Sequence, residues 1–172
     1  MLADPADQQR LLTLAELDSE IGRLQHTAKK LPQHARIAEL MKNRQAVTDD
    51  LVAVTTRVED LELSVRRAES DLVPVRTRLD RESRRVEDGS VTDPKVLRGL
   101  MEEVERIKRR ITELEDAELD LMEQLEEATA ERDELATGKK DVEETLRAEV
   151  AVRDAEVGKL STEAKAIASS RA

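Results

Sequence analysis

Hydrophobic residues recur along this chain at alternating steps of three and four. A first stretch carries Leu11, Leu14, Leu17, Ile21, Leu24, Ala28 and Leu31. A second carries Ile37, Leu40, Val47, Leu51, Val54, Val58, Leu61, Val65, Ala68, Leu72, Val75 and Leu79, and a third continues the pattern from Leu97 to Ile167. An average spacing of 3.5 residues puts these side chains on one narrow stripe of a helix, as in a left-handed supercoil. The pattern therefore predicts an all-α protein built from long coiled-coil helices.

The stretch VEDGSVTDPK, residues 86–95, interrupts this pattern. Gly89 is suited to the left-handed conformation that ends a helix. Asp4-Pro5 and Asp93-Pro94 each place a capping carboxylate before a proline at the first helical position. We therefore expect a single hairpin domain over 1–172, with helices at about 5–31, 34–87 and 94–171 and a tip loop at about 88–93.

A short loop requires the two long stripes to fold back on each other, and this selects an antiparallel register. Facing positions then have residue numbers with a constant sum, near 182 for a loop centred near residue 91. Val75 with Ile107 and Val54 with Ala128 meet this sum, and Leu24 with Val157 and Ile21 with Leu160 give 181. The predicted fold is a long antiparallel coiled-coil hairpin.

Two prolines lie within the predicted helices. Proline removes a backbone hydrogen bond and restricts the residue before it, so Pro32 should break the first arm. Pro74 should bend the second segment for the same reason. We expect the hairpin to be kinked near Pro32 and Pro74.

Composition excludes several classes of protein. Charged residues make up 40% of the chain, there is no Phe, Tyr or Trp, and the net charge is −10. An ordinary globular core would use aromatic residues, and an acidic chain repels nucleic acid and anionic lipid. The absence of cysteine excludes disulfides and thiolate metal sites.

No apolar run reaches the roughly 20 residues of a membrane span, and the N-terminal residues lack the features of a signal peptide. We expect a cytoplasmic protein that does not enter membranes.

No residues form a recognisable catalytic pattern. The sequence contains no nucleophile–base pair, phosphate-binding loop or metal-ligand cluster, and adjacent carboxylates on a helix do not face each other. We therefore expect no enzyme activity, and no cofactor bound by this chain.

Charge changes sign towards the predicted tip. Residues 115–134 hold ten acids and one base, whereas residues 66–110 hold 13 bases and ten acids. The candidate partner-binding residues at the tip are Arg84, Arg85, Asp93, Lys95 and Arg98. The alternative is ordinary pairing of these bases with acids such as Glu102, Glu103 and Glu105.

The stretch GSVTDPKVLRGLMEEVERIKRRITELEDAELDLMEQLEEA, from Gly89 to Ala128, resembles the C4-type zinc ribbon domain-containing family. Those proteins combine an N-terminal coiled-coil hairpin with a C-terminal four-cysteine zinc ribbon. VTDPKVL at the tip and LEDAELDLMEQLE further on carry the resemblance, and LADPADQQRLLTLAELDSEIGRL and LPQHARIAEL are similar to the family's start. The resemblance implies a kinked hairpin, with zinc bound only where the ribbon is present. This chain has no cysteine and ends where the ribbon would begin.

Two hypotheses about function follow. The first is a non-catalytic interaction or scaffold module that presents its tip to a protein partner, since some members of the family act as adaptors or bind an alternative sigma factor. The second is a protein that binds RNA or DNA mainly through the ribbon. The chain alone lacks the aromatic platforms that single-stranded nucleic acid uses. The hydrophobic pattern is compatible with a monomer and with a homodimer.

Overall fold

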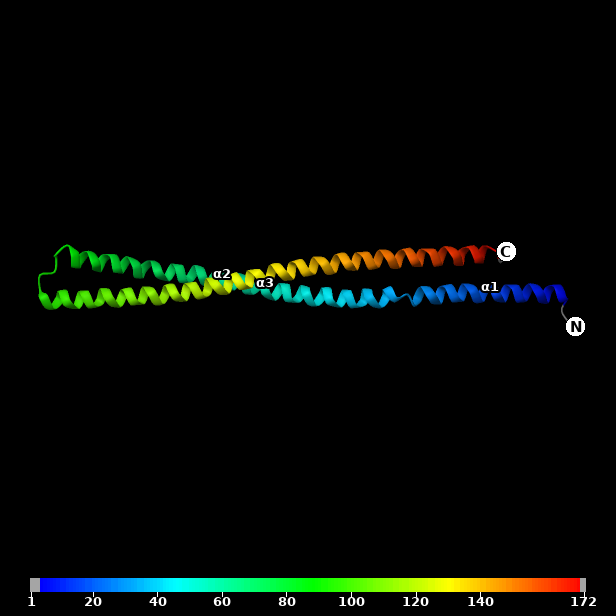
Figure 1. Cartoon of the computed structure of the whole chain (residues 1–172), viewed down its shortest axis with the longest axis horizontal. Coiled ribbons are helices and arrows are strands. Elements are labelled where there is room, and N and C mark those ends of the chain that lie inside the picture. The colour runs from blue at the N-terminus through cyan, green and yellow to red at the C-terminus, as the bar shows by residue number, and fades with distance from the viewer. Residues whose placement is uncertain (1–3, 171–172) are drawn as a thin grey trace. The chain divides into compact units, whose positions relative to one another are not determined.

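The computed structural model describes residues 4–170 and consists of three α-helices. They are α1 (Pro5–Lys29), α2 (Pro32–Glu87) and α3 (Pro94–Ser169), and the described residues contain no strand. Figure 1 shows the chain reversing direction between α2 and α3. The all-α prediction is confirmed. The predicted end of the last helix at residue 171 lies outside the described residues.

The helices contribute to two compact units. The first, called the terminal unit here, comprises Met1–Thr48 with Thr137–Ala172; the second, called the tip unit, is Asp49–Ala136. The terminal unit therefore contains α1, the start of α2 and the end of α3. The tip unit contains the rest of α2, the loop and the first part of α3.

Packing in the tip unit follows the predicted register. Leu72, Ile107 and Ile111 form a buried cluster against which Val75, Leu79 and Leu114 pack. Val75 and Ile107, expected to face each other, belong to this same cluster. Ion pairs also join the two helices, including Arg57 with Glu131 at 3.3 Å and Arg76 with Glu115 at 2.6 Å. The apolar stripes of α2 and α3 thus bury each other here in antiparallel orientation.

The chain breaks between α1 and α2, as expected, but the helix bounds differ. The first helix ends at Lys29, and α2 starts at Pro32, two residues earlier than expected. Proline fits the first helical position because its missing N–H would have no partner there. The Lys30 amide bonds to the carbonyls of His26 and Thr27, both at 3.1 Å, and His34 Nε2 lies 3.0 Å from the Ala28 carbonyl oxygen.

Pro74 does not interrupt α2. The helix continues through it to Glu87, although the Ser70 carbonyl loses the amide donor that proline lacks. Leu72, two residues away, is the most deeply buried large side chain, with 1% of its surface exposed. Packing of this segment against Ile107 and Ile111 stabilises a helix that local preference alone would break. Pro74 is therefore accommodated within a continuous helix, which is compatible with the predicted bend.

Candidate functional site

The loop at the tip is held by its own side chains. Gly89 has a φ of 67°, the left-handed conformation expected after a helix end. The Asp88 carboxylate accepts a hydrogen bond from the Ser90 amide at 2.9 Å, and hydrogen bonds from Ser90 lower the pKa of Asp88. Ser90 Oγ in turn lies 3.4 Å from the Arg85 carbonyl oxygen. The tip is thus a defined turn with local hydrogen bonds.

Asp93 caps α3. Its Oδ1 accepts hydrogen bonds from the amides of Lys95 at 2.8 Å and Val96 at 3.4 Å, and Pro94 follows at the first helical position. These are amides that have no partner within a helix. Asp93, predicted as a partner-binding residue, therefore has a clear local role in starting the helix.

Glu82 lies at the centre of a cluster of charges near the end of α2. It is the buried charged residue of the tip unit, with 6% of its surface exposed. Its carboxylate accepts hydrogen bonds from Arg81 at 2.9 Å and Arg85 at 2.7 Å. The bond from Arg81, helped by Arg85, lowers the pKa of Glu82 against the opposing effect of burial. Glu82 thus neutralises Arg85, one of the predicted binding residues.

Other bases of the tip unit are also paired. Glu103 accepts from Arg78 at 2.6 Å and from Arg106 at 2.7 Å, so one carboxylate joins α2 to α3. Further pairs near the tip are Arg76–Glu115, Lys108–Glu105 and Arg110–Glu113. The alternative of ordinary pairing with nearby acids therefore holds for many of these bases.

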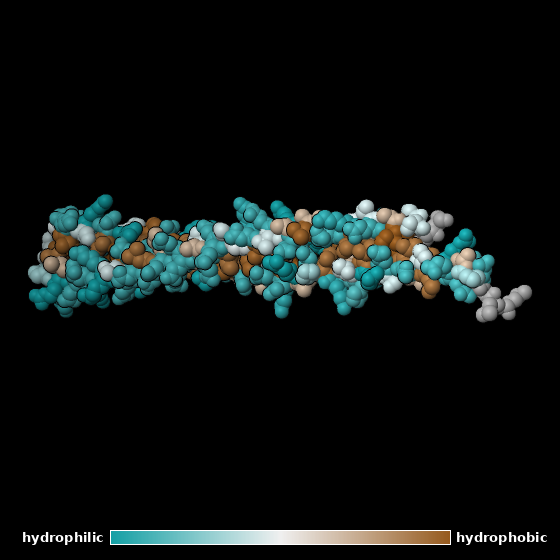
Figure 2. Space-filling model, turned by 45° about the vertical axis from the view of Figure 1, so that its right-hand side comes forward, coloured by the Kyte–Doolittle hydropathy of each residue, from teal (hydrophilic) through white to brown (hydrophobic). Residues whose placement is uncertain are grey.

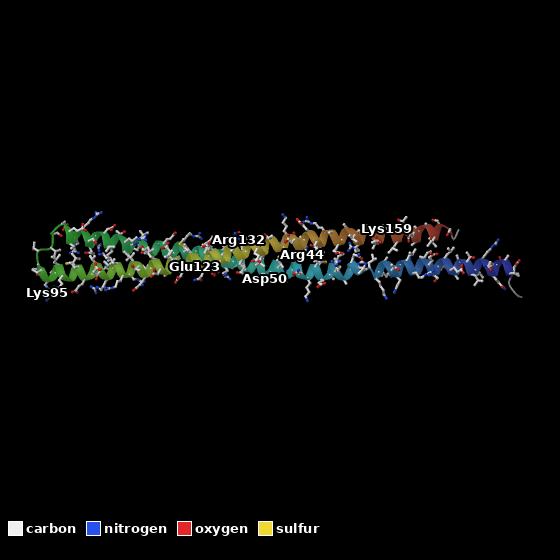
Figure 3. The ribbon with its side chains drawn as sticks, in the orientation of Figure 1. Arg44, Asp50, Lys95, Glu123, Arg132 and Lys159 are labelled. Atoms are coloured by element: carbon white, nitrogen blue, oxygen red, sulfur yellow. The ribbon has the colours of Figure 1, made fainter. Side chains whose placement is uncertain are left out.

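Between residues 76 and 110, four bases form no ion pair with the described residues: Arg84, Lys95, Arg98 and Arg109. Three of them were predicted as binding residues. All four are exposed, and Lys95, Arg98 and Arg109 recur on α3 at helical spacing. Figure 3 shows Lys95 beside the turn between the two helices.

Apolar side chains are exposed beside these bases. Val96 has 51% and Met101 53% of its surface exposed. Met101 and Arg109 line the same shallow depression of about 420 Å³ on α3, together with Glu102, Glu105 and Arg106. The surface near the tip therefore combines unpaired positive charge with apolar area, and we call Arg84, Lys95, Val96, Arg98, Met101 and Arg109 the tip surface.

The sequence prediction missed Glu82 and Arg109. Glu82 follows Leu72, Val75 and Leu79 at steps of three and four, so its place on the apolar stripe was a signal that it would be buried. Nothing in the sequence distinguishes Arg109 from Arg106 and Arg110, which form ion pairs. Which acid comes close enough to pair with each base is set only by the folded structure.

The described residues contain neither a metal-ligand cluster nor a membrane-spanning helix. Between residues 4 and 170, no three His, Asp or Glu side chains gather in a way that would hold a metal ion. No helix in that range is long and apolar enough to cross a membrane.

The fold and tip define a coiled-coil hairpin, and comparison with known proteins gives its family. Residues 14–172 match the family described as "CT398-like coiled coil hairpin domain". Because this match covers most of the chain, the protein belongs to that family. The match concerns the hairpin, so the predicted relation to zinc ribbon proteins stays a prediction.

Relatives occur in mycobacteria. The chain is 39% identical over 121 residues to the uncharacterized protein Rv2229c of Mycobacterium tuberculosis, covering 70% of this chain and 49% of the relative. It is 35% identical over 104 residues to the uncharacterized protein ML1638 of Mycobacterium leprae, covering 60% and 44%. The aligned part thus spans about half the length of these relatives.

A solved structure of a Mycobacterium smegmatis protein resembles the chain throughout. The TM-score is 0.81 at 33% sequence identity, and the match covers 99% of this chain and 70% of the other.

Proposed function

We propose that this chain is a non-catalytic interaction module whose tip surface binds an acidic protein partner. The proposal rests on the division of the bases near the tip into those that form ion pairs and those that do not. Arg78, Arg81 and Arg85 are neutralised by Glu82 and Glu103, whereas Arg84, Lys95, Arg98 and Arg109 are left unpaired. Unpaired surface charges attract and orient a partner of opposite charge.

The exposed apolar side chains support a protein as the partner. Val96 and Met101 would supply the apolar contact area that charged side chains lack. Methionine also adapts its shape to different partners because its side chain is unbranched and flexible. An acidic segment with one apolar face matches this combination best. Asp93 and Arg85 would position the surface by shaping the loop and the end of α2.

The proposed context is a longer cytoplasmic protein in which a zinc ribbon follows the hairpin. The mycobacterial relatives contain further residues outside the aligned part, which leaves room for another domain. The zinc ion would belong to that ribbon. Four cysteines at paired Cys-x-x-Cys spacing after Ala172, with one zinc ion per chain by elemental analysis, would test this context.

The tip surface is tested by reversing its charge. We expect the fourfold variant Arg84→Glu, Lys95→Glu, Arg98→Glu and Arg109→Glu to lose partners that the unmodified chain retains in affinity pull-downs quantified by mass spectrometry. A control with the same change in net charge replaces Lys42, Arg67, Lys140 and Arg147 by Glu, all exposed and without an ion pair within the described residues. Equal retention by both variants would contradict the proposal.

Nucleic acid is the second candidate, since the same four bases could bind phosphates. The whole chain carries a charge of −10, which opposes this interaction. Titration with RNA and DNA at two salt concentrations distinguishes the candidates, because contacts to phosphate weaken steeply as salt rises.

A further inference from the structure

A second row of side chains runs along α3 on a face that does not pack against α2. Its members follow one another at steps of three and four, so they share one stripe of the helix. We call it the outer row, and it comprises Arg98, Met101, Glu105, Lys108, Thr112, Glu115, Leu119, Met122 and Glu126. Eight of the nine are exposed, and Glu115 is half-buried. The outer row is therefore open to a further contact.

The large apolar side chains of the outer row are exposed. Leu119 has 62%, Met101 53% and Met122 48% of its surface exposed. Figure 2 shows small hydrophobic patches among the hydrophilic side chains of the tip unit, in the left part of the view. Leaving such side chains in water is unfavourable. Met101 belongs to the tip surface, so the outer row connects that surface to an apolar stretch further along α3.

Charge changes sign along α3 at Thr112. Residues 95–111 hold six bases and three acids, a net charge of +3, whereas the equally long stretch 113–129 holds eight acids and no base, a net charge of −8. Among the described residues, Glu113 and Glu115 form ion pairs and the other six acids of this stretch form none. One helix thus carries unpaired bases before Thr112 and unpaired acids after it.

The stretch 113–129 has the chemistry expected of a partner for the tip surface. That partner is an acidic segment with one apolar face, and this stretch presents Leu119 and Met122 among unpaired acids. The two surfaces do not meet within one chain. At about 1.5 Å per residue, Leu119 lies about 27 Å from Met101 along the same continuous helix. A second copy of the chain, however, supplies the acidic stretch.

We propose that α3 packs antiparallel on α3 of a second copy through the outer row, so that the tip surface of each copy binds residues 113–129 of the other. The proposal rests on the function proposed for the tip surface and names its partner. A two-fold axis at Thr112 places residues 95–111 opposite 113–129 twice, as an isologous interface requires. The net charges of the facing stretches are then +3 and −8.

Charge complementarity continues up to the axis itself. Residues 109–116 read RRITELED, with two bases before Thr112 and three acids after it. The axis places Arg98 opposite Glu126 and Arg109 opposite Asp116, each twice, and none of these four residues forms an ion pair within residues 4–170. Lys108 lies opposite Glu115 in the same way. These six contacts between opposite charges outnumber the two between Glu102 and Glu123 at the edge of the row.

Apolar contacts follow from the same axis. Leu119 of one copy lies opposite Glu105 of the other, which lines the depression of about 420 Å³ together with Met101 and Arg109. Met101 lies opposite Met122. The most exposed apolar side chain of the row therefore meets a depression, and flexible methionine side chains beside it adapt to its shape.

Charge reversal tests the contact and its direction. We expect Arg98→Glu with Arg109→Glu, and separately Asp116→Lys with Glu126→Lys, to weaken self-association by about tenfold or more in sedimentation equilibrium near physiological salt. Each double variant creates four like-charged contacts. An equimolar mixture of the two should form a heterodimer with an affinity close to that of the unmodified chain, because each of these contacts then joins opposite charges.

Control variants make the same changes of charge away from the outer row. Asp120→Lys with Glu127→Lys alters α3 itself, and Arg67→Glu with Lys140→Glu matches the loss of two bases. All four positions are exposed and form no ion pair within the described residues. We expect both controls to associate nearly as the unmodified chain does.

The apolar contact is tested by one substitution. We expect Leu119→Gln to weaken the dimer by about tenfold, because two copies of the side chain leave the interface. Leu63→Gln is the matched control, since Leu63 is also an exposed leucine of the tip unit but lies on α2. Equal effects of the two substitutions on association would contradict the proposed interface.

Spin labels test the orientation independently. The chain has no cysteine, so the single substitutions Thr112→Cys and Gln124→Cys each carry one label. Antiparallel pairing about Thr112 brings the labels at residue 112 together and separates those at residue 124 by about 35 Å along the axis. Parallel pairing would make both separations short and would overturn the proposal.

The remaining outcomes separate this dimer from the function proposed for the tip surface. If the unmodified chain stays monomeric throughout the micromolar range while the fourfold tip variant loses partners in pull-downs, a different acidic protein binds the tip surface and the dimer is overturned. If the chain is monomeric and the fourfold variant retains the same partners as its control, both proposals fail. A dimer that Asp116→Lys with Glu126→Lys leaves as stable as its control would overturn this interface alone.

Discussion

Glu82 occupies a position on α2 where the repeat predicts an apolar side chain. Its carboxylate is buried between Arg81 and Arg85, which provide two hydrogen bonds. A buried charge is tolerated when it is paired and hydrogen-bonded in this way. The position of Glu82 was readable from the spacing of Leu72, Val75 and Leu79. The sequence did not show which bases Glu82 would pair with, because several bases lie within one helical turn of it.

The lowered pKa of Glu82 predicts how stability depends on pH. A carboxyl group with a folded pKa below its ordinary value of 4.5 stabilises the fold above that value, and this contribution is lost as pH falls through the folded pKa. We expect Glu82→Gln to lower the thermal unfolding midpoint by a few degrees at pH 7 relative to the unmodified chain. The difference should shrink towards pH 3. Circular dichroism melts of both chains measure it, and a constant difference across this range would contradict the assignment.

Asp93 gives a second prediction at the level of one residue. Because its carboxylate caps α3, we expect Asp93→Ala to destabilise the fold by about 1 kcal/mol in chemical denaturation. Asp93→Asn removes the charge but retains a capping oxygen, so it should cost much less. If Asn were as destabilising as Ala, charge and not the cap would be the contribution of this residue.

The helices show where local preferences and packing disagree. The predicted break near Pro32 is present, because this proline starts α2 and has no need of an amide donor there. Pro74 is chemically identical, but it lies among side chains that bury Leu72 against Ile107 and Ile111. The sequence predicts a break at Pro32 and a bend at Pro74, although the local effect of proline on the backbone is the same at both positions. Only the packing around each one distinguishes a helix start from an uninterrupted helix.

Substitution of the two prolines should therefore have different effects. We expect Pro74→Ala to raise the free energy of unfolding by up to about 3 kcal/mol, because it restores the amide that can bond to the Ser70 carbonyl. Pro32→Ala, the matched control, should change it much less. Denaturant unfolding measures both, and equal effects would contradict this explanation.

At the scale of the whole molecule, net charge and local charge have opposite signs. The chain carries −10, yet four bases near the tip form no ion pair within residues 4–170, although Arg109 lies close enough to Glu105 to lower its pKa. Long-range electrostatics follow the total charge, whereas a docked partner experiences the nearby groups. A protein partner with a small acidic surface meets the bases near the tip and little of the acidic remainder. A long polyanion would also be repelled by the net charge of the whole chain.

The opposite signs of the net charge and of the charge near the tip predict how the chain interacts with nucleic acid. We expect weak binding of single-stranded RNA at low salt in fluorescence anisotropy, and none measurable near physiological salt. The fourfold tip variant should abolish even the low-salt binding, while the control variant of equal charge should reduce it less. Tight binding that persists as salt rises would favour the nucleic-acid hypothesis.

The sequence by itself determined the helices, their reversal near Gly89 and the antiparallel register, because each depends on a repeated spacing or on a local cap. It also identified the tip as a concentration of bases. Only the tertiary structure decided which of these bases remain unpaired, since an ion pair depends on the few ångströms between side chains of neighbouring turns and opposite helices. The burial of apolar side chains likewise depends on how closely the helices approach each other. The apolar stripe of α1 resembles the others in sequence, but no residue of α1 is buried in the folded chain.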